Sequence, residues 1–345
     1  MLTPTERDEV VSSAQPAPQA LPKVSVCVVT YNHAKFIEVC LQSLVDQDTS
    51  FPFEVIVSDD ASTDGTGELI LAFADRYPGI VRAFVQPRNL GATSNYFFVH
   101  AVARGDYVAH VDGDDFALPG KLQKLHDGLE SNAKVNIVWH RMKILDEHGR
   151  QAVGMPLEPH TARTIYGSNR ITLDRLLLFY SVGGYHSGSM YRRSARKVFD
   201  NGRPTLDYVI SLSLCEDGEG LHLDEALGVY RWFASERTVT KEPHNWIVNE
   251  ALLEILRRYG TEQPQHRKSV VAHATMKALI TLYLRNPFWK RYAKLVLDLR
   301  TVPRAEDLLF IWRVFDAGRA KRLRHLLDGQ DKTTVSATER TARDQ

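Results

Sequence analysis

The chain has 345 residues, of which 43% are hydrophobic and 25% charged, which indicates a globular protein of one large or two modest domains. Its formal net charge of +1 argues against the strong basic field with which proteins attract nucleic acid. The three cysteines form no CxxC pair, so we expect buried thiols and a reducing, cytoplasmic environment. No run approaches the roughly 18 to 20 apolar residues that span a bilayer, and we expect no signal peptide before the first strand.

Strands alternate with helices after a tail at 1–20, which lacks periodicity and is predicted to be flexible. Short runs rich in β-branched residues predict strands at 24–32, 53–60, 80–86 and 106–112. Helices are predicted between them at 34–47, 67–77 and 93–104. This alternation indicates βαβ units, and therefore an α/β fold with a mostly parallel sheet.

The carboxyl ends of these strands are polar, and in open α/β sheets ligands bind at that edge. They read TYN at 30–32, SDDASTDGT at 58–66 and VDGDD at 111–115. None contains the glycine-rich loop that cradles phosphate in dinucleotide-binding and P-loop proteins, so those classes are excluded. A diphosphate held at such acidic ends needs a divalent cation, because Mg²⁺ and Mn²⁺ bind carboxylate and phosphate oxygens together.

Three carboxylates, Asp112, Asp114 and Asp115, crowd one strand end. Alternate residues of a strand stand roughly 6.6 Å apart, which is too far for two carboxylates to coordinate one ion symmetrically. We therefore expect divided roles, one carboxylate on a metal and another on sugar hydroxyls, with Gly113 letting the chain bend between them.

Four blocks of the sequence, in this order, resemble glycosyltransferase family 2: VSVCVVTYNHAKFIEVCLQSLVDQ at 24–47, FEVIVSDDASTDGT at 53–66, NLGATSNYFF at 89–98 and DYVAHVDGDDFALPGKLQKL at 106–125. The resemblance is close from residue 22 to about 148 and weaker to about 233. It implies a GT-A fold, which is a Rossmann-like sheet flanked by helices. It also implies an inverting, metal-dependent enzyme that uses nucleotide-sugar donors.

The resemblance assigns donor-binding roles to the first two strand ends. Tyr31 would stack on a uracil-type base, with Thr30 beside it. Asp60 would accept a hydrogen bond from the base ring N–H, with Asp59 close by. Asp64 is better interpreted as a turn or helix-capping residue than as a ligand.

Further roles follow from the later blocks. Asp112 or Asp114 would bind the ribose hydroxyls, and Asp114 or Asp115 would bind Mn²⁺ or Mg²⁺. The segment GGYHSGSMYRRS at 183–194 resembles the strand beside the donor sugar, where His186, Ser187 and Ser189 would line the sugar pocket. Arg231 matches a Tyr-Arg pair of the family near the diphosphate.

An inverting transfer also needs a base for the acceptor hydroxyl. The register of the family blocks selects Asp207, at the predicted start of a helix, over Glu216 and Asp217 near its far end. Two departures affect donor choice and metal affinity. Ser94 stands where many relatives have a basic residue, and Phe233 replaces a histidine for which His244 is a candidate substitute.

The chain is expected to divide into a catalytic domain at 21–235, a helical region at 236–330 and a disordered tail at 331–345. Eleven Lys or Arg against four acids lie between Arg285 and Arg324, interleaved with aromatic residues. These helices either rest on an anionic membrane surface, making the protein peripheral on the inner face of the cell membrane, or pack as a cap with a solvated basic face.

The leading hypothesis is a transferase that moves a sugar from a UDP- or dTDP-type donor to an acceptor hydroxyl in surface polysaccharide or lipid-linked glycan synthesis. One alternative is a nucleotide-sugar-binding assembly subunit with weak or no turnover. A second is a sugar-nucleotide nucleotidyltransferase, which would want a glycine- and arginine-rich loop after the first strand, where VVTYNHAKF has none.

Overall fold

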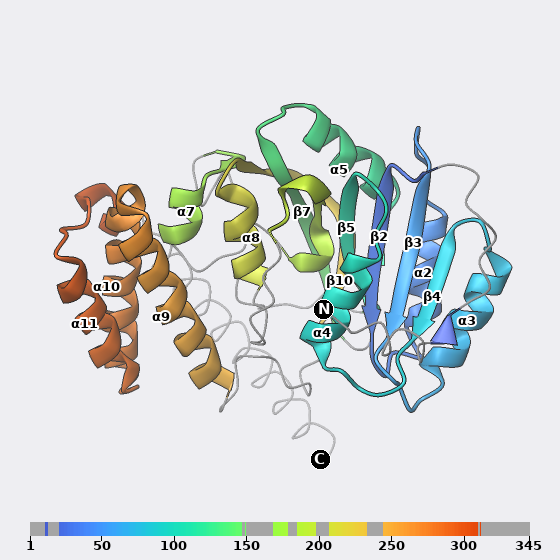
Figure 1. Cartoon of the computed structure of the whole chain (residues 1–345), viewed down its shortest axis with the longest axis horizontal. Coiled ribbons are helices and arrows are strands. Elements are labelled where there is room, and N and C mark those ends of the chain that lie inside the picture. The colour runs from blue at the N-terminus through green and yellow to red at the C-terminus, as the bar shows by residue number, and fades with distance from the viewer. Residues whose placement is uncertain are drawn as a thin grey trace, which may run out of the picture. The chain divides into compact units, whose positions relative to one another are not determined.

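The computed structural model describes residues 11–12, 21–146, 149, 168–178, 185–197, 207–232, 244–309 and 311. The chain divides into two compact units (Figure 1). The first comprises residues 1–151, 161–176 and 180–235, and the second comprises 152–160, 177–179 and 236–345. The predicted tail at 331–345 and most of the tail at 1–20 lie outside the described residues.

The first unit is built on one mixed sheet, which has ten strands in the described part of the chain, in the order β1-β4-β3-β2-β5-β9-β7-β10-β6 with β8 on β10. The strands are β1 Val11–Ser12, β2 Val24–Thr30, β3 Phe53–Asp59, β4 Val81–Val85, β5 Tyr107–Asp112, β6 Phe116–Ala117, β7 Val135–Asp146, β8 Arg170–Ile171, β9 Ser189–Arg192 and β10 Glu219–Trp232. The four predicted strands are β2 to β5, and they are parallel neighbours (Figure 1).

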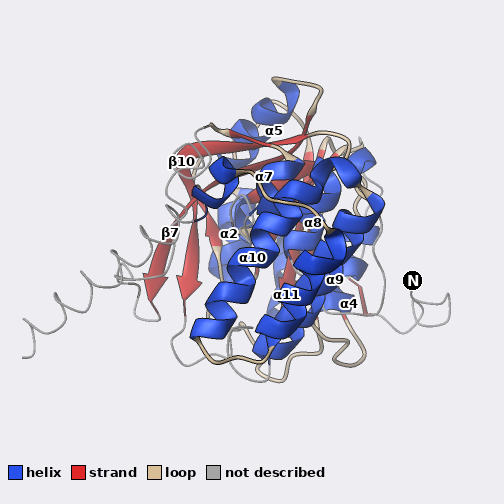
Figure 2. Ribbon diagram, turned by 90° about the vertical axis from the view of Figure 1, so that its left-hand side faces the viewer, coloured by secondary structure: helices blue, strands red, loops and turns tan. Residues whose placement is uncertain are grey.

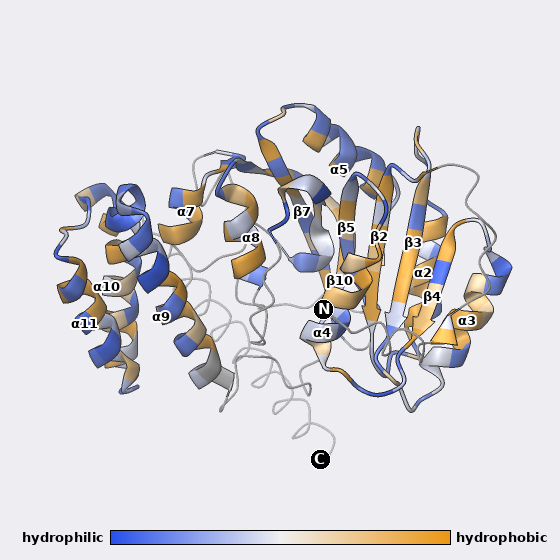
Figure 3. Ribbon diagram, viewed as in Figure 1, coloured by the Kyte–Doolittle hydropathy of each residue, from blue (hydrophilic) through white to orange (hydrophobic). Residues whose placement is uncertain are grey.

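Helices cover both faces of this sheet. In chain order they are α2 Ile37–Val45, α3 Thr66–Arg76, α4 Ala92–Ala101, α5 Lys121–Glu130, α7 Leu173–Leu178 (which ends in the second unit) and α8 Asp207–Cys215, with 3₁₀ turns η1 His186–Gly188 and η2 Arg193–Ala195. Alternate residues of β2 and β3 pack in one core with α2, α3 and α5. The opposite face meets α4, where the Cys27 thiol donates to the Val99 carbonyl at 3.5 Å. Burial on both faces explains the continuous hydrophobic runs of these strands (Figure 3).

The remaining half of the sheet is mixed. β7 and β10 form a long parallel ladder, while β9 runs antiparallel between β5 and β7. The antiparallel ladders are short, so the sheet is mostly parallel by paired length, as predicted. Val11–Ser12 add an unpredicted strand to the edge of β4, whose free backbone groups accept any extended segment.

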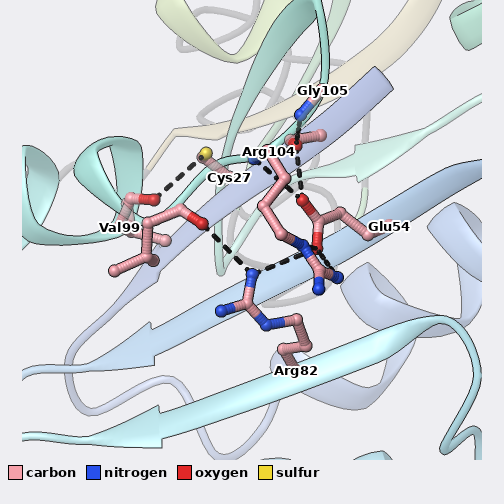
Figure 4. A network of polar contacts seen from close by, with 8 residues as sticks. Cys27, Glu54, Arg82, Val99, Arg104 and Gly105 are labelled. Carbon is pink, nitrogen blue, oxygen red and sulfur yellow. Dashed lines mark hydrogen bonds and ion pairs between the residues drawn. The ribbon is translucent and has the colours of Figure 1, made fainter. Parts of the chain in front are cut away.

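The amino-terminal ends of β2 and β3 are fastened by a buried carboxylate, Glu54 (Figure 4). Its Oε1 accepts from the Ser25 hydroxyl (2.6 Å) and the Arg104 N–H (3.1 Å). Its Oε2 accepts from the guanidinium groups of Arg104 (2.5 Å) and Arg82 (3.1 Å). This cluster lies at the opposite end of the strands from their polar carboxyl ends and serves the fold.

In the second unit three helices lie side by side (Figure 2). They are α9 His244–Glu262, α10 Arg267–Tyr283 and α11 Phe288–Leu299, joined by a 3₁₀ turn, η3 Pro264–His266. Their buried faces share apolar side chains such as Leu256, Val270 and Leu295, and the Tyr292 hydroxyl donates to the Asn249 side chain at 2.9 Å. None of the helices in the described part of the chain is long and apolar enough to cross a bilayer.

Candidate active site

The carboxyl ends of three neighbouring parallel strands meet at one edge of the sheet. β2 pairs with β3 so that Thr30 lies opposite Asp59, and with β5 so that Val29 lies opposite Asp112. The loop after β3 stays attached to β2, because the Asp60 N–H donates to the Thr30 carbonyl at 3.0 Å. The polar strand ends are therefore brought together.

Side-chain hydrogen bonds join the loop after β2 to the turn after β3. Asp64 accepts from the Ala34 N–H at 3.0 Å and from the N–H and hydroxyl of Thr66 at 3.1 and 2.5 Å. Asp64 is thus a turn residue. Tyr31, in the loop so fixed, is 44% exposed, so its ring is open to a planar partner.

Asp59 and Asp60 are both buried, and both hold backbone turns. Asp59 accepts from the Ser62 N–H (2.9 Å) and hydroxyl, and Asp60 accepts from the N–H groups of Leu90 (2.7 Å) and Gly91 (2.9 Å). Burial raises the pKa of each carboxyl against the effect of these hydrogen bonds. Asp60 fixes the turn before α4, so its predicted bond to a base N–H would use a remaining lone pair.

Asp112 ends β5 with both carboxylate oxygens held. His110 Nε2 lies 3.1 Å from Oδ1, and the Ser187 hydroxyl donates to Oδ2 at 3.0 Å. Burial alone would raise the pKa of Asp112, but the hydrogen bonds from His110 and Ser187 hold it well below its usual value. The side chain is 37% exposed, so a fixed, ionised acceptor reaches solvent where ribose hydroxyls are predicted to bind.

Gly113 is required for close approach. A Cβ there would lie 2.7 Å from the Thr30 hydroxyl and 2.8 Å from the Thr30 Cβ. Its φ lies outside the left-handed region, unlike that of Gly65 or Gly91, so the expected bend is not what demands a glycine. The buried Thr30 hydroxyl has no hydrogen-bond partner among the described residues.

Asp115 is fully buried and joins residues 112–115, the acidic loop, to β10. Its Oδ1 accepts from the Arg231 N–H at 2.9 Å, while its Oδ2 finds no hydrogen-bond partner in the described part of the chain. The Arg231 guanidinium donates to the Asp114 carbonyl and lies 4.9 Å from the ring centres of both Phe36 and Phe116. Arg231, predicted near the diphosphate, thus lies against the acidic loop.

The acidic loop fits a divalent cation. Burial, followed by the Asp114 and Asp112 carboxylates, raises the pKa of Asp115, so a cation here would relieve repulsion and satisfy the orphaned oxygen. The described residues contain no cluster of three His, Cys, Asp or Glu placed to hold a metal alone. Mg²⁺ and Mn²⁺ commonly use one or two carboxylates with water and phosphate oxygens, which is the set this loop offers.

Asp207 is the first residue of α8, as predicted, and its side chain is about half exposed. His186 Nδ1 lies 3.0 Å from Asp207 Oδ1. The rival acids Glu216 and Asp217 follow the far end of α8, where the Lys197 ammonium lies 2.6 and 2.9 Å from their carboxylates. The structure therefore distinguishes an aspartate in contact with a partly buried histidine from two acids that both pair with Lys197.

His186 links the two parts of the site. Its ring stacks on that of His110 at 4.0 Å between ring centres, and His110 contacts Asp112. Ser187 and Ser189, predicted to line the sugar pocket with His186, both have partners within the protein. The Ser187 hydroxyl donates to Asp112, and the Ser189 hydroxyl donates to the His186 carbonyl at 2.7 Å. The sugar-lining role of these residues stays a prediction.

The comparisons with known proteins agree with this geometry. Residues 25–199, half of the chain, match the model of glycosyl transferase family 2. The chain belongs to this family.

Two curated relatives illustrate the relation. The protein EpsE of Bacillus subtilis is 31% identical over 213 residues, covering 60% of this chain and 72% of EpsE. An uncharacterized protein of Mycobacterium tuberculosis H37Rv is 30% identical over 211 residues, covering 60% of this chain. The match spans only 58% of that mycobacterial relative.

Two solved structures share the fold. TarS of S. aureus in complex with UDP-GlcNAc superposes with a TM-score of 0.56 at 20% identity, covering 87% of this chain and 88% of that chain. GalNAc-T7 with UDP, GalNAc and Mn²⁺ gives a TM-score of 0.51 at 14% identity, covering 82% of this chain and 56% of that one. The predicted GT-A fold of this family 2 member is confirmed.

Three buried residues near the family's acidic loop were not singled out from the sequence: His100, His110 and Lys121. The signal was a histidine inside a predicted apolar strand, and a lysine at the start of the following helix. Lys121 Nζ donates to the Ser187 carbonyl at 2.5 Å, and burial lowers the pKa of Lys121 to about 8. It places a cation below the acidic strand end.

The departures from the family pattern fall in different places. Ser94 is exposed in the first turn of α4. Phe233 lies outside the described residues, and His244 begins α9 in the second unit. A surface hollow of about 450 Å³ lies beside Lys23 and Tyr107, at the start of β5 and away from the acidic loop.

Proposed function

We propose that this protein is an inverting glycosyltransferase that moves a sugar from a UDP- or dTDP-type donor to an acceptor hydroxyl in surface polysaccharide or lipid-linked glycan synthesis. One observation carries the proposal: the ends of β2, β3 and β5 converge, and Asp207 is joined to Asp112 through two stacked histidines. Nucleotide-binding groups and a candidate base thus belong to one site.

The donor end is supported by exposure and charge. The Tyr31 ring is open for stacking on a base, and Asp112 presents an ionised acceptor to ribose hydroxyls. TarS, which shares the fold, forms a complex with UDP-GlcNAc, and GalNAc-T7 is complexed with UDP, GalNAc and Mn²⁺. These ligands support a uridine-type donor for this chain as well.

The diphosphate end needs positive charge. Asp114 and Asp115 would hold Mn²⁺ or Mg²⁺, which when bound neutralises the diphosphate and stabilises it as a leaving group. Arg231 would contribute from β10, since its guanidinium already lies at the Asp114 carbonyl.

The acceptor end needs a proton acceptor. Asp207 would take the hydroxyl proton as the acceptor oxygen attacks the anomeric carbon and the bond to the diphosphate breaks. Its half-exposed carboxylate at the start of α8 is accessible to an incoming hydroxyl, whereas Asp217 and Glu216 contact Lys197.

The test screens hydrolysis of UDP-, dTDP- and GDP-sugars with Mn²⁺ or Mg²⁺. Asp207→Asn should lower turnover by about 10²- to 10⁴-fold, the usual contribution of a general base, with donor affinity nearly unchanged. Asp217→Asn is the matched control and should retain turnover. Loss of turnover in Asp217→Asn and not in Asp207→Asn would place the base at Asp217. Tight donor binding without turnover would favour the assembly-subunit alternative, and nucleotidyl transfer from a sugar phosphate would favour the nucleotidyltransferase.

For the second unit we propose contact with an anionic membrane surface. Leu282, Tyr283 and Leu284 are exposed at the end of α10, and the cations Arg285 and Lys290 follow. Exposed apolar and aromatic side chains beside cations are typical of interfacial binding. Two other cations between Arg285 and Arg324 have acidic partners, since Arg291 pairs with Glu250 and Lys294 with Asp298. Residues 282–290 are therefore a better candidate for membrane contact than the part of α11 that carries these ion pairs.

A further inference from the structure

Three histidines of the first unit form a cluster at the end of β5, in which His100 and His110 are buried and His186 is partly buried. His110 lies on β5, His100 on α4 and His186 in η1. The ring of His186 stacks on that of His110 at 4.0 Å and 26°, and His100 Nε2 lies 3.0 Å from His110 Nδ1. Where two histidine nitrogens face each other at this distance, one must donate an N–H and the other must accept, so the tautomer of each ring is fixed.

The carboxylate of Asp112 fixes the direction of the hydrogen bonds. Because a carboxylate only accepts, His110 donates from Nε2 to Asp112, which leaves Nδ1 to accept from His100 Nε2–H. His100 Nδ1 then accepts from the Tyr191 hydroxyl at 2.7 Å. Burial lowers the pKa of His110 to about 4 and that of His100 well below its usual value, so both rings are neutral, as this chain of donors requires.

The hydrogen-bonded, neutral rings of His110 and His100 support the ring of His186. The ring of His186 is held from one side by His110 and from another by the buried ring of Tyr96, at 5.0 Å between centres. Its Nδ1 is thereby aimed at Asp207 Oδ1, 3.0 Å away. Asp207 itself is half exposed, so its carboxylate would otherwise be free to rotate.

We propose that His186 is a positioning residue for Asp207: it holds one carboxylate oxygen, so that the other faces the acceptor hydroxyl, at a spacing from Asp112 set by the stacked His110. The proposal rests on Asp207 being the base of the proposed transfer. A base held in place loses little freedom when the acceptor binds, and displacement of a reacting group by 1 Å can cost about 10²-fold in rate.

The first test is spectroscopic and needs no substrate. In protein labelled with ¹⁵N-histidine, the Nδ1 proton of His186 should give a low-field, slowly exchanging resonance that disappears in Asp207→Ala. His222→Asn, which changes a buried histidine of β10 whose Nδ1 lies 3.7 Å from Asp224, is the control and should leave that resonance in place. A resonance unaffected by Asp207→Ala would overturn the contact.

The second test compares two amides during hydrolysis of UDP-GlcNAc with Mn²⁺. Asparagine keeps a donor near the position of Nδ1, whereas glutamine moves it toward that of Nε2. His186→Asn should stay near the wild-type kcat, while His186→Gln should lose about 10- to 100-fold in kcat with little change in KM. Both variants place an amide at this partly buried position, so a difference between them reports the donor position rather than folding.

The last arm asks whether His186 acts through Asp207. Adding His186→Gln to Asp207→Asn should cost no more than about twofold beyond Asp207→Asn alone, because residues that share one function are not additive. Additive losses, or equal losses in the two amide variants, would overturn the positioning role. If His186→Asn lost as much as Asp207→Asn, the histidine would be the base instead. Unchanged hydrolysis in Asp207→Asn would refute the proposed base and not the contact, which the resonance tests separately.

Discussion

Replacing Gly113 by alanine should disable the acidic loop by a steric effect alone. The added Cβ would lie 2.7 Å from the Thr30 hydroxyl oxygen and 2.8 Å from the Thr30 Cβ, whereas ordinary contacts begin at 3.4 Å. Thr30 cannot retreat easily, because it ends a strand buried on both sides and paired with β3. The loop that carries Asp112, Asp114 and Asp115 must therefore shift by several tenths of an ångström.

Two consequences of different size follow. Overpacking a tight site costs about 1 to 3 kcal/mol, so the melting temperature should fall by roughly 2 to 12 °C. Turnover should fall further, because the rate is sensitive to shifts of several tenths of an ångström at reacting groups, where a full 1 Å costs about 10²-fold. We therefore expect a folded protein with weak donor hydrolysis.

The assay measures donor hydrolysis with Mn²⁺ and thermal unfolding in parallel for Gly113→Ala and Gly79→Ala. A Cβ at Gly79 would meet nothing within 4 Å, and the backbone there is not left-handed, so this control should keep both properties. Normal turnover in Gly113→Ala would refute the claim that the loop depends on this close approach. Unfolding of Gly113→Ala at room temperature would show that the destabilisation expected from overpacking is too small.

Three further predictions concern the fold, the metal and the membrane. Glu54→Gln should destabilise the protein by about 3 kcal/mol at neutral pH, since it leaves Arg82 and Arg104 without their buried charge partner. Burial opposes ionisation of Glu54, yet the hydrogen bonds from Arg104 and Ser25 keep its pKa below the usual value. The ionised Glu54 carboxylate thus stabilises the fold above its unfolded pKa of about 4.3, and this stabilisation is lost as the pH falls through its folded pKa. In urea unfolding, the difference in unfolding free energy between wild type and Glu54→Gln should therefore become smaller in acid. EDTA should abolish donor hydrolysis and Mn²⁺ or Mg²⁺ should restore it, while full activity in chelator would contradict a metal at Asp114 and Asp115. Liposomes with anionic lipid should co-sediment the protein and raised salt should release it, with Tyr283→Ser weakening the binding; indifference to lipid charge would support the packed-cap alternative.

The first half of the fold was predictable because each of its signals is local. β-branched runs such as VSVCVVT are buried on both faces of a parallel sheet, and a strand of that kind needs no polar alternation. The acidic strand ends were predictable for the same reason, since one rule places ligands at that edge of any open α/β sheet. The short strands β6 and β8 carry two residues each and give no periodicity, so only their tertiary pairing with β10 defines them.

The partnership of His186 with Asp207 was beyond sequence reasoning for a physical reason. The segment 183–194 is informative about the site only once β9 is inserted antiparallel between β5 and β7, a pairing that joins distant segments and leaves no local signature. That insertion puts η1 at the end of β5, and it makes His110, an unexplained polar residue in an apolar strand, the support for His186. A buried histidine on a strand next to an acidic terminus is therefore informative, because burial without a partner is costly and the partner must come from an element folded over it. Here that element carries the residue that holds the candidate base.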